Sequence, residues 1–151
     1  MKRSQRPFSQ REQTAWRAFY DLQEVLRGRL EQHLQADSGL SHADYTVLAV
    51  LSEADGHRLR AVELGQKVGW EKSRLHHQLT RMCNRGLVRR SSGEGRAVNV
   101  TITPAGHAAL DAAVPFHRQH VRHLVVDRLS PEQLDELGAI SRTLLDGLRR
   151  Q

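Results

Sequence analysis

The segment from Trp70 to Arg90, WEKSRLHHQLTRMCNRGLVRR, concentrates side chains that attract polyanions. It holds one lysine, five arginines and a pair of adjacent histidines, and its only acid is Glu71, close to its start. Lys and Arg bind phosphates, and Arg can also form two hydrogen bonds to the edge of a guanine. The segment therefore has the chemistry needed to bind a nucleic acid, whereas an ordinary solvated helix mixes carboxylates with its cations.

The positive charge of the chain lies in its middle third. The chain has 23 Lys and Arg against 17 Asp and Glu, a net charge of +6, and the segment 57–103 holds ten of these cations but only three of the acids. This segment is therefore +7, and the remainder is −1. A polyanionic partner explains the asymmetry, although charge alone leaves a solvated basic face as the alternative.

Residues 70–86 are predicted to form an amphipathic helix with a cationic outer face. Leu75, Leu79 and Met82 recur at helical spacing and form the predicted buried stripe, and Gly86 is placed to end the helix. The opposite side is entirely polar or cationic and consists of Ser73, His77, Thr80 and Asn84, flanked by Arg74, His76 and Arg81. A helix with this face fits the major groove of DNA, and it explains the histidine pair without a metal ion.

Two further helices are predicted before this segment. Apolar residues at spacings of three and four predict a helix over Thr14–Leu34. Ser41 is the predicted N-cap of the next helix, with Asp44 as the acid of a capping box, and this helix should end near Asp55-Gly56.

Two helices are also predicted at the C-terminal end. Thr103 is the expected N-cap of one, which should run through Pro115 to about Leu129. Ser130 caps the other, with Gln133 completing a capping box.

The central elements predict a winged helix-turn-helix. A strand stub over 57–60 precedes a short helix over 61–69 that should turn Val62, Leu64 and Val68 inward. After the basic helix, the β-rich runs LVRR and AVNVTIT flank the turn residues SSGEG, which predicts a hairpin. The predicted fold class is mainly α with a small β-hairpin wing.

The predicted wing carries a cation at its tip. Arg96 lies at or near the turn, and a tip Arg can enter the narrow, negative minor groove of A/T-rich DNA. Glu94, two residues earlier, is expected to support this side chain through an ion pair. An ordinary exposed loop Arg is the alternative that spacing alone does not exclude.

The chain resembles the MarR family of dimeric transcription regulators over nearly its whole length. The resemblance rests on DYTVLAVLSEADGHRLRAVELGQKVGWEKSRLHHQLTRM, RGLVRR and GRAVNVTITPAG, and WEKSRL is most similar to a branch common among actinobacteria. The family usually has Asp where this chain has Glu94, a longer side chain that should keep the wing ion pair but shift its geometry. The resemblance implies a homodimer on a palindromic operator, repression or less often activation of nearby genes, and small anionic aromatic effectors.

These inferences define the expected organisation. We expect one domain over 1–151, with a winged helix-turn-helix lobe at 41–103 and dimerisation helices at 8–36 and 104–151. Double-stranded DNA is the expected partner. The expected DNA-contacting residues are Lys72, Ser73, Arg74, His76, His77, Thr80, Arg81, Arg90 and Arg96.

Dimerisation also follows from the apolar residues at both ends of the chain. The stripe at the N-terminal end consists of Trp16, Phe19, Tyr20, Leu26 and Leu30. The stripe at the C-terminal end consists of Leu134, Leu137, Ile140, Leu144 and Leu148. A compact central lobe is too small to cover both, so a second chain is expected to do so.

Two features raise the alternative of a metal- or redox-responsive regulator of the same fold. Cys83 lies half-turned to the core near the end of the basic helix, where a packed small hydrophobe is the favoured interpretation over a redox sensor. His117, His120 and His123 are spaced three apart, but no Glu or Cys lies beside them, and Arg118 and Arg122 would repel a cation. We therefore expect no metal site and no cofactor.

Other classes of protein are disfavoured. No nucleophile elbow, glycine-rich phosphate loop or paired inward carboxylates indicate an enzyme. A non-specific architectural DNA-binding protein would explain the charge but not the long apolar helices. The single Cys, the lack of an apolar stretch after the basic N-terminus and the lack of a membrane-spanning run predict a cytoplasmic protein.

Overall fold

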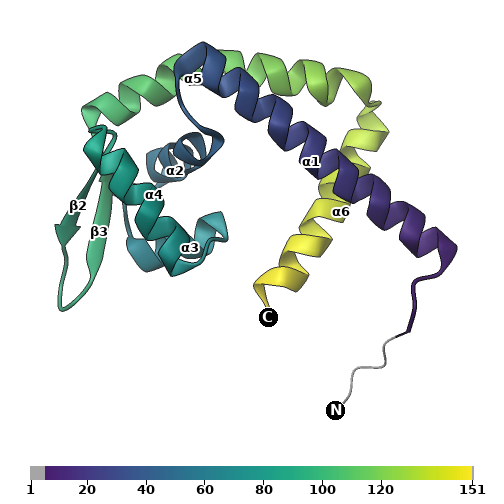
Figure 1. The fold of residues 1–151 in the computed structure, drawn as a ribbon, viewed down its shortest axis with the longest axis horizontal. Coiled ribbons are helices and arrows are strands. Elements are labelled where there is room, and N and C mark those ends of the chain that lie inside the picture. Colours follow the sequence, from purple (N-terminus) through teal and green to yellow (C-terminus); the bar gives the residue numbers. More distant parts are fainter. Residues whose placement is uncertain (1–5, 151) are drawn as a thin grey trace.

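A computed structural model describes residues 6–150 and places a small winged lobe beneath a frame of long helices (Figure 1). Residues 1–5 and 151, which belong to the predicted single domain, lie outside the described part. The lobe contains α2 (His42–Glu53), β1 (Arg58–Arg60), α3 (Ala61–Val68), α4 (Lys72–Asn84), β2 (Val88–Ser92) and β3 (Val98–Ile102). The frame contains α1 (Gln10–Ser38), α5 (Pro104–Leu124) and α6 (Pro131–Arg149), and short 3₁₀ turns lie at Asp55–His57 and Val126–Arg128.

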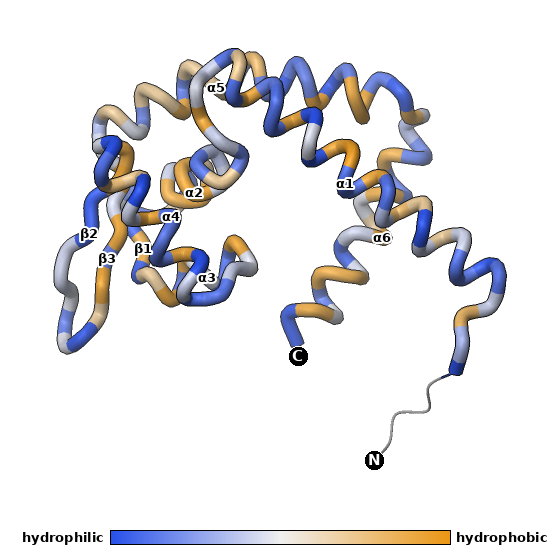
Figure 2. The backbone as a smooth tube through the Cα atoms, viewed as in Figure 1, coloured by the Kyte–Doolittle hydropathy of each residue, from blue (hydrophilic) through white to orange (hydrophobic). Residues whose placement is uncertain are grey.

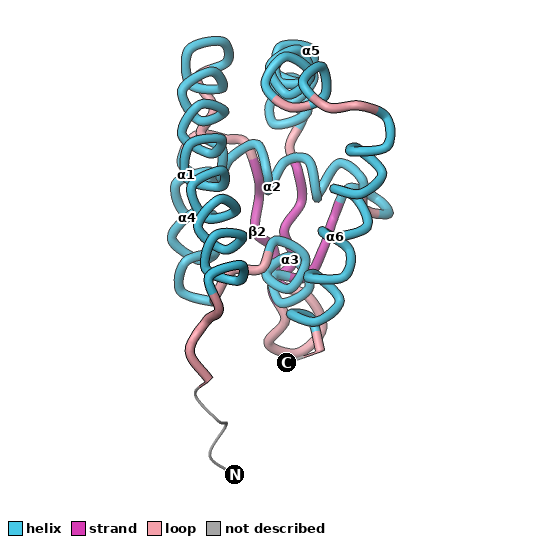
Figure 3. Tube along the Cα trace, turned by 90° about the vertical axis from the view of Figure 1, so that its right-hand side faces the viewer, coloured by secondary structure: helices cyan, strands magenta, loops and turns pink. Residues whose placement is uncertain are grey.

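The three strands form an antiparallel sheet in the order β1-β3-β2 (Figure 3). The predicted hairpin is confirmed, with Val88 opposite Ile102 and Ser92 opposite Val98. The predicted strand stub is confirmed as β1, which pairs with β3 so that Leu59 faces Val100. Because β3 is central, its alternate residues enter the core.

The core of the lobe forms where α2, α3, α4 and the sheet meet. Its buried residues are Leu34, Leu40, Val47, Leu48, Leu51, Leu64, Leu75, Leu79, Met82, Leu87, Val88, Val100, Ile102, Leu110 and Ala113. This set confirms the buried stripe predicted on the basic helix. The N-cap at Ser41 with Asp44 in a capping box is also confirmed.

The prediction that Val62 points inward is wrong. Leu64 is fully buried on the same helix, whereas Val62 is 71% exposed. Val62 is the second residue of an eight-residue helix and lies on the side opposite the core contact. It borders a hollow described below.

The first helix is longer than predicted at both ends. It begins at Gln10 because Ser9 and Glu12 form a capping box, and it ends at Ser38 because Gly39 adopts a left-handed conformation with φ of 70°. The spacing of apolar residues predicts only the apolar part of the helix, because the polar turns at each end have no apolar residues at helical spacing.

The fifth helix is shorter than predicted. It passes through Pro115 and ends at Leu124, followed by a 3₁₀ turn rather than further α-helix to Leu129. The predicted capping box of Ser130 and Gln133 then starts α6. α1 packs along α5, and no residue of α6 is buried. Hydrophobic stretches of α1 and α6 extend beyond the lobe (Figure 2).

Candidate DNA-binding site

The outer face of α4 is placed as predicted. Leu75, Leu79 and Met82 are buried, while Ser73, Arg74, His76, His77 and Arg81 are exposed and Thr80 is half-buried. Lys72 is the exposed first residue of the helix. The helix thus presents donors and cations outward from a packed base, which is the arrangement a major groove requires.

A buried carboxylate fixes α4 against α2. Asp44 is 2% exposed and accepts a hydrogen bond of 2.7 Å from Nε2 of Gln78, which is itself 4% exposed. Arg85 donates to the other oxygen of Asp44 at 2.5 Å, and Arg81 donates to Oε1 of Gln78 at 2.6 Å. The orientation of α4 therefore depends on a polar network as well as on apolar packing.

This network was not predicted from the sequence. Asp44 was assigned only to helix capping, and Gln78 was not assigned to the buried stripe. On a helical wheel Gln78 lies beside Leu75 and Met82. That position was the available signal that its side chain enters the core.

The turn before α4 holds Arg74 against an aromatic ring. Gly69 adopts a left-handed conformation with φ of 72° and ends α3, and the N–H groups of Gly69 and Trp70 both bond to the carbonyl of Gly65. The guanidinium of Arg74 lies 4.4 Å from the centre of the Trp70 ring. This cation–π contact limits the rotamers of Arg74 before DNA arrives.

The first turn of α4 is open to an anion. Glu71 is at the N-cap position, and no side chain caps the helix there. The backbone N–H groups of that turn therefore have no capping side chain, and Lys72 and Ser73 in the same turn are exposed. A DNA phosphate at this point would be bound by these backbone and side-chain groups and would also be stabilised by the helix dipole.

Arg90 connects the wing to α4. Its guanidinium donates to Oγ1 of Thr80 at 3.0 Å and lies 3.3 Å from Nδ1 of His76. Thr80 in turn donates to the carbonyl of His76 at 3.0 Å. Both Arg90 and Thr80 were expected to contact DNA, and here they also set the position of the hairpin relative to the helix.

The wing tip exposes Arg96 and Glu94. The tip is closed by a hydrogen bond from the N–H of Gly93 to the carbonyl of Ala97, and Gly95 has a φ of 67°. In the part of the chain that the structure describes, no ion pair joins Glu94 to Arg96. Support of Arg96 by Glu94 stays a prediction for the DNA-bound state.

An apolar hollow is lined by residues of α3, α4 and the wing. Its volume is about 740 Å³, and its lining is mainly apolar, with exposed Val62 and Val98 at its edges. Arg90 and His76 also line it. The hollow is large enough for a small organic molecule.

The two candidate sensor groups have different surroundings. Cys83 is partly buried and packs against the core, as predicted for a small hydrophobe. Of the three spaced histidines, His117 and His120 are partly buried and His123 is exposed. His120 contacts His33 and Asp37 of α1.

The fold and the cationic face of α4 define a winged helix-turn-helix DNA-binding protein. No protein-family profile matches the chain. The chain is 37% identical to the MarR family regulator AbsC of Streptomyces coelicolor, covering 97% of this chain and 99% of that one, with a TM-score of 0.90. It is 35% identical to Sco3205, a MarR family regulator from the same organism solved in complex with DNA, covering 94% of each chain, with a TM-score of 0.90. A transcriptional repressor of Bacillus subtilis, YetL, is 26% identical over 120 residues, which is 78% of this chain and 71% of that protein.

The chain belongs to the MarR family. It is a DNA-binding transcriptional regulator and not an enzyme, and its Streptomyces relatives confirm the resemblance to the actinobacterial branch. Over residues 6–150, none of the helices is both long and apolar enough to cross a bilayer.

Proposed function

We propose that this protein is a repressor that binds a palindromic operator as a homodimer. The observation that carries the proposal is α4, whose outward face has donors and cations without a carboxylate and whose inward face is fixed by Asp44. The repressor YetL is a relative in sequence, which supports repression over activation. Two copies of α4 would enter successive major grooves, so the half-sites should lie about one helical turn apart.

The helix and the wing have different roles in this proposal. Ser73, Arg74, His77 and Arg81 read base edges or hold nearby phosphates, and Lys72 binds a phosphate at the helix start. His76, Thr80 and Arg90 hold the wing against α4, and their remaining donors are available to the DNA backbone. Arg96, supported by Glu94, enters the minor groove.

The exposed apolar residues of α1 and α6 support the homodimer. Trp16, Tyr20, Ile140 and Leu148 are 52%, 52%, 59% and 68% exposed. These helices correspond to the expected dimerisation segments 8–36 and 104–151, the latter of which also includes α5. An apolar surface of this kind on both arms is typical of a subunit interface, because water contact with it is unfavourable.

The hollow beside α4 is the candidate binding site for a small anionic aromatic effector. Its apolar lining suits a ring, and Arg90 provides a cation for a carboxylate. A ligand there would compete for Arg90 with Thr80 and so alter the position of the wing. Effector binding and DNA binding would thereby be coupled.

The test compares Arg74→Ala with Arg96→Ala. An operator obtained by selecting genomic fragments is titrated with each variant, together with single-base variants and random DNA, at several salt concentrations. Arg74→Ala should cost ~1–3 kcal/mol on the operator and relax preference at one symmetric position in each half-site. Arg96→Ala should weaken binding evenly across sequences and reduce the salt dependence.

Arg118→Ala is the matched control, because Arg118 is an exposed cation on α5, outside the winged lobe. Its effect on affinity and on sequence preference should be small. The roles are reversed if Arg96→Ala changes preference at a major-groove position while Arg74→Ala leaves every preference intact. Protection of long DNA with no preferred sequence would instead indicate an architectural protein.

A further inference from the structure

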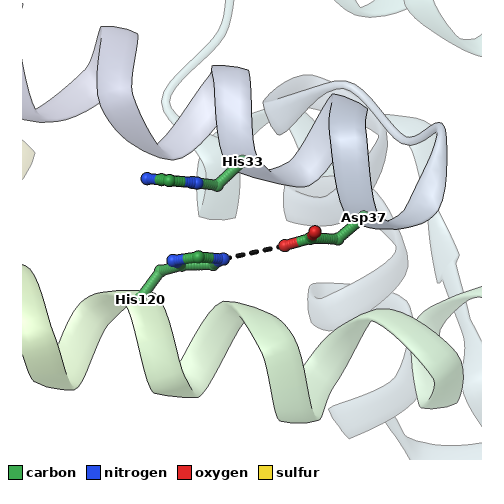
Figure 4. A group of neighbouring side chains, drawn as sticks. All are labelled: His33, Asp37 and His120. Atoms are coloured by element: carbon green, nitrogen blue, oxygen red, sulfur yellow. Dashed lines mark hydrogen bonds and ion pairs between the residues drawn. The ribbon is translucent and has the colours of Figure 1, made fainter.

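A cluster of nitrogen and oxygen ligands joins α1 to α5, outside the DNA-binding face. His33 and Asp37 are one helical turn apart on α1 and point toward α5, from which His120 extends to meet them (Figure 4). The rings of His33 and His120 stack with centroids 3.7 Å apart, and Nε2 of His120 lies 2.7 Å from Oδ2 of Asp37. One potential ligand atom from each residue lies within 4.8 Å of the other two.

We propose that His33, Asp37 and His120 form a site for a divalent transition metal ion, with Zn²⁺ as the ion of best fit. Two imidazole nitrogens and one carboxylate oxygen are a usual ligand set for Zn²⁺, with bonds of about 2.0–2.2 Å that hold neighbouring ligand atoms about 3.3–3.5 Å apart. Nε2 of His120 and Oδ2 of Asp37, at 2.7 Å, are closer than this, and all three ligand atoms lie within 4.8 Å of one another. Small side-chain rotations would suffice to close the three groups around an ion.

The arrangement is poorly explained as an ion pair alone. His120 and Asp37 have side chains 27% and 31% exposed, and a pair with that much solvent contact contributes little to stability. Stacked imidazoles at 3.7 Å also repel each other when both are protonated. A metal ion binds both rings in their neutral form and uses the carboxylate as well, so it satisfies all three groups together.

The surroundings favour a cation more than the sequence suggested. The acid that was missing beside the histidines of α5 comes from α1, as Asp37. Arg122 was expected to repel a cation. Its Nη1 lies 3.7 Å from Oδ1 of Asp127, and this carboxylate offsets its charge. Solvent access at His120 and Asp37 leaves room for a water molecule as a fourth ligand, as in open zinc sites.

A further histidine of α5, His117, lies three positions before His120. The pKa of His117 is lowered by burial and, to a lesser extent, by His42 and His120. Nδ1 of His42 is buried and has no hydrogen-bond partner among the described residues. An unpaired buried nitrogen of this kind is costly.

The test measures Zn²⁺ binding to the full chain by calorimetry against a competing chelator. The wild-type chain should bind one Zn²⁺ tightly per subunit. His33→Ala, Asp37→Asn and His120→Ala should each weaken that binding by at least about 100-fold, because loss of a direct ligand should exceed the 10–100-fold cost of losing an outer-shell group. His123→Ala removes an exposed histidine from the same helix and should leave binding unchanged.

Two further measurements distinguish Zn²⁺ binding at this site from Zn²⁺ binding elsewhere on the protein. Co²⁺ substituted into the wild-type site should give the intense visible absorption of a tetrahedral ion, and Zn²⁺ should raise the melting temperature of the wild type but not of Asp37→Asn. Asp37→Asn preserves the shape of the side chain, so its fold can be checked by circular dichroism. The proposal is overturned if the wild type binds Zn²⁺ no more tightly than these variants. It is also overturned if Co²⁺ remains octahedral, or if tight binding is lost only when the exposed pair His76 and His77 is replaced.

Discussion

Replacing Asp44 with Ala should both destabilise the protein and weaken its binding to DNA. The carboxylate accepts hydrogen bonds from the N–H of Ser41 at 2.9 Å, from Gln78 at 2.7 Å and from Arg85 at 2.5 Å. Removal leaves the buried amide of Gln78 without its acceptor, which costs about 1–3 kcal/mol. Arg85 is 46% exposed, so loss of its ion pair adds less than about 1 kcal/mol, and loss of one arm of the capping box adds about 0.5 kcal/mol or more.

These contributions predict that the free energy of unfolding falls by about 2–4 kcal/mol. Urea unfolding followed by circular dichroism measures this loss, at one fixed protein concentration because dimer stability depends on concentration. DNA titration, under conditions where each variant is fully folded, then measures the effect on α4. Affinity should fall because the link from α2 to Gln78 no longer fixes the helix.

Glu12→Ala provides the matched control. Glu12 occupies the same capping-box position on α1 as Asp44 does on α2, and it bonds to the N–H of Ser9 at 2.7 Å. It is exposed and makes no contact with α4, so its replacement should lower stability far less and leave DNA affinity unchanged. Equal losses in the two variants would refute the reasoning, since they would show that Asp44 acts only as a cap.

Three other outcomes are expected. Sedimentation should show a dimer at micromolar concentration, and a stable folded monomer would contradict the interface assigned to α1 and α6. Cys83→Ser should leave DNA affinity and its response to peroxide unchanged; a loss of affinity on oxidation in the wild type alone would establish a redox sensor. Gly106→Ala should destabilise the protein by about 1–3 kcal/mol or more, because the added Cβ would lie 2.1 Å from the carbonyl oxygen of Leu87. Urea unfolding checks this against Gly28→Ala, which has no atom within 4 Å to meet and should gain up to about 1 kcal/mol from helix propensity.

The parts of the fold with local signals were predictable from the sequence. These signals depend only on residues a few positions apart in the sequence. They are the capping residues such as Ser41 and Ser130, the buried stripe around Leu79 and the turn residues before Arg96. The winged helix-turn-helix follows from their order. The errors arose where such signals stop, as in the polar ends of α1, or where the helix is very short, as at Val62.

The contacts that organise the sites were not predictable in the same way. Asp44 and Gln78 are 34 positions apart, and Asp37 and His120 are 83 positions apart. Within its own helix, each of these residues has an ordinary local explanation, as a cap, a polar surface residue or a solvated histidine. Only the packing of α2 on α4 and of α1 on α5 brings the partners together.

Two networks hold the surface that we propose reads DNA. The Asp44 network fixes α4 from behind, while Arg90 fixes the wing from the side through Thr80. The DNA-reading surface is therefore a unit whose orientation depends on α2. α2 begins at His42, whose backbone N–H donates to Oε2 of Glu31 in α1 at 2.8 Å. In the proposed mode of DNA binding, a ligand that changed the angle between α1 and α5 would act on the start of α2, two residues before Asp44, and so on the orientation of α4.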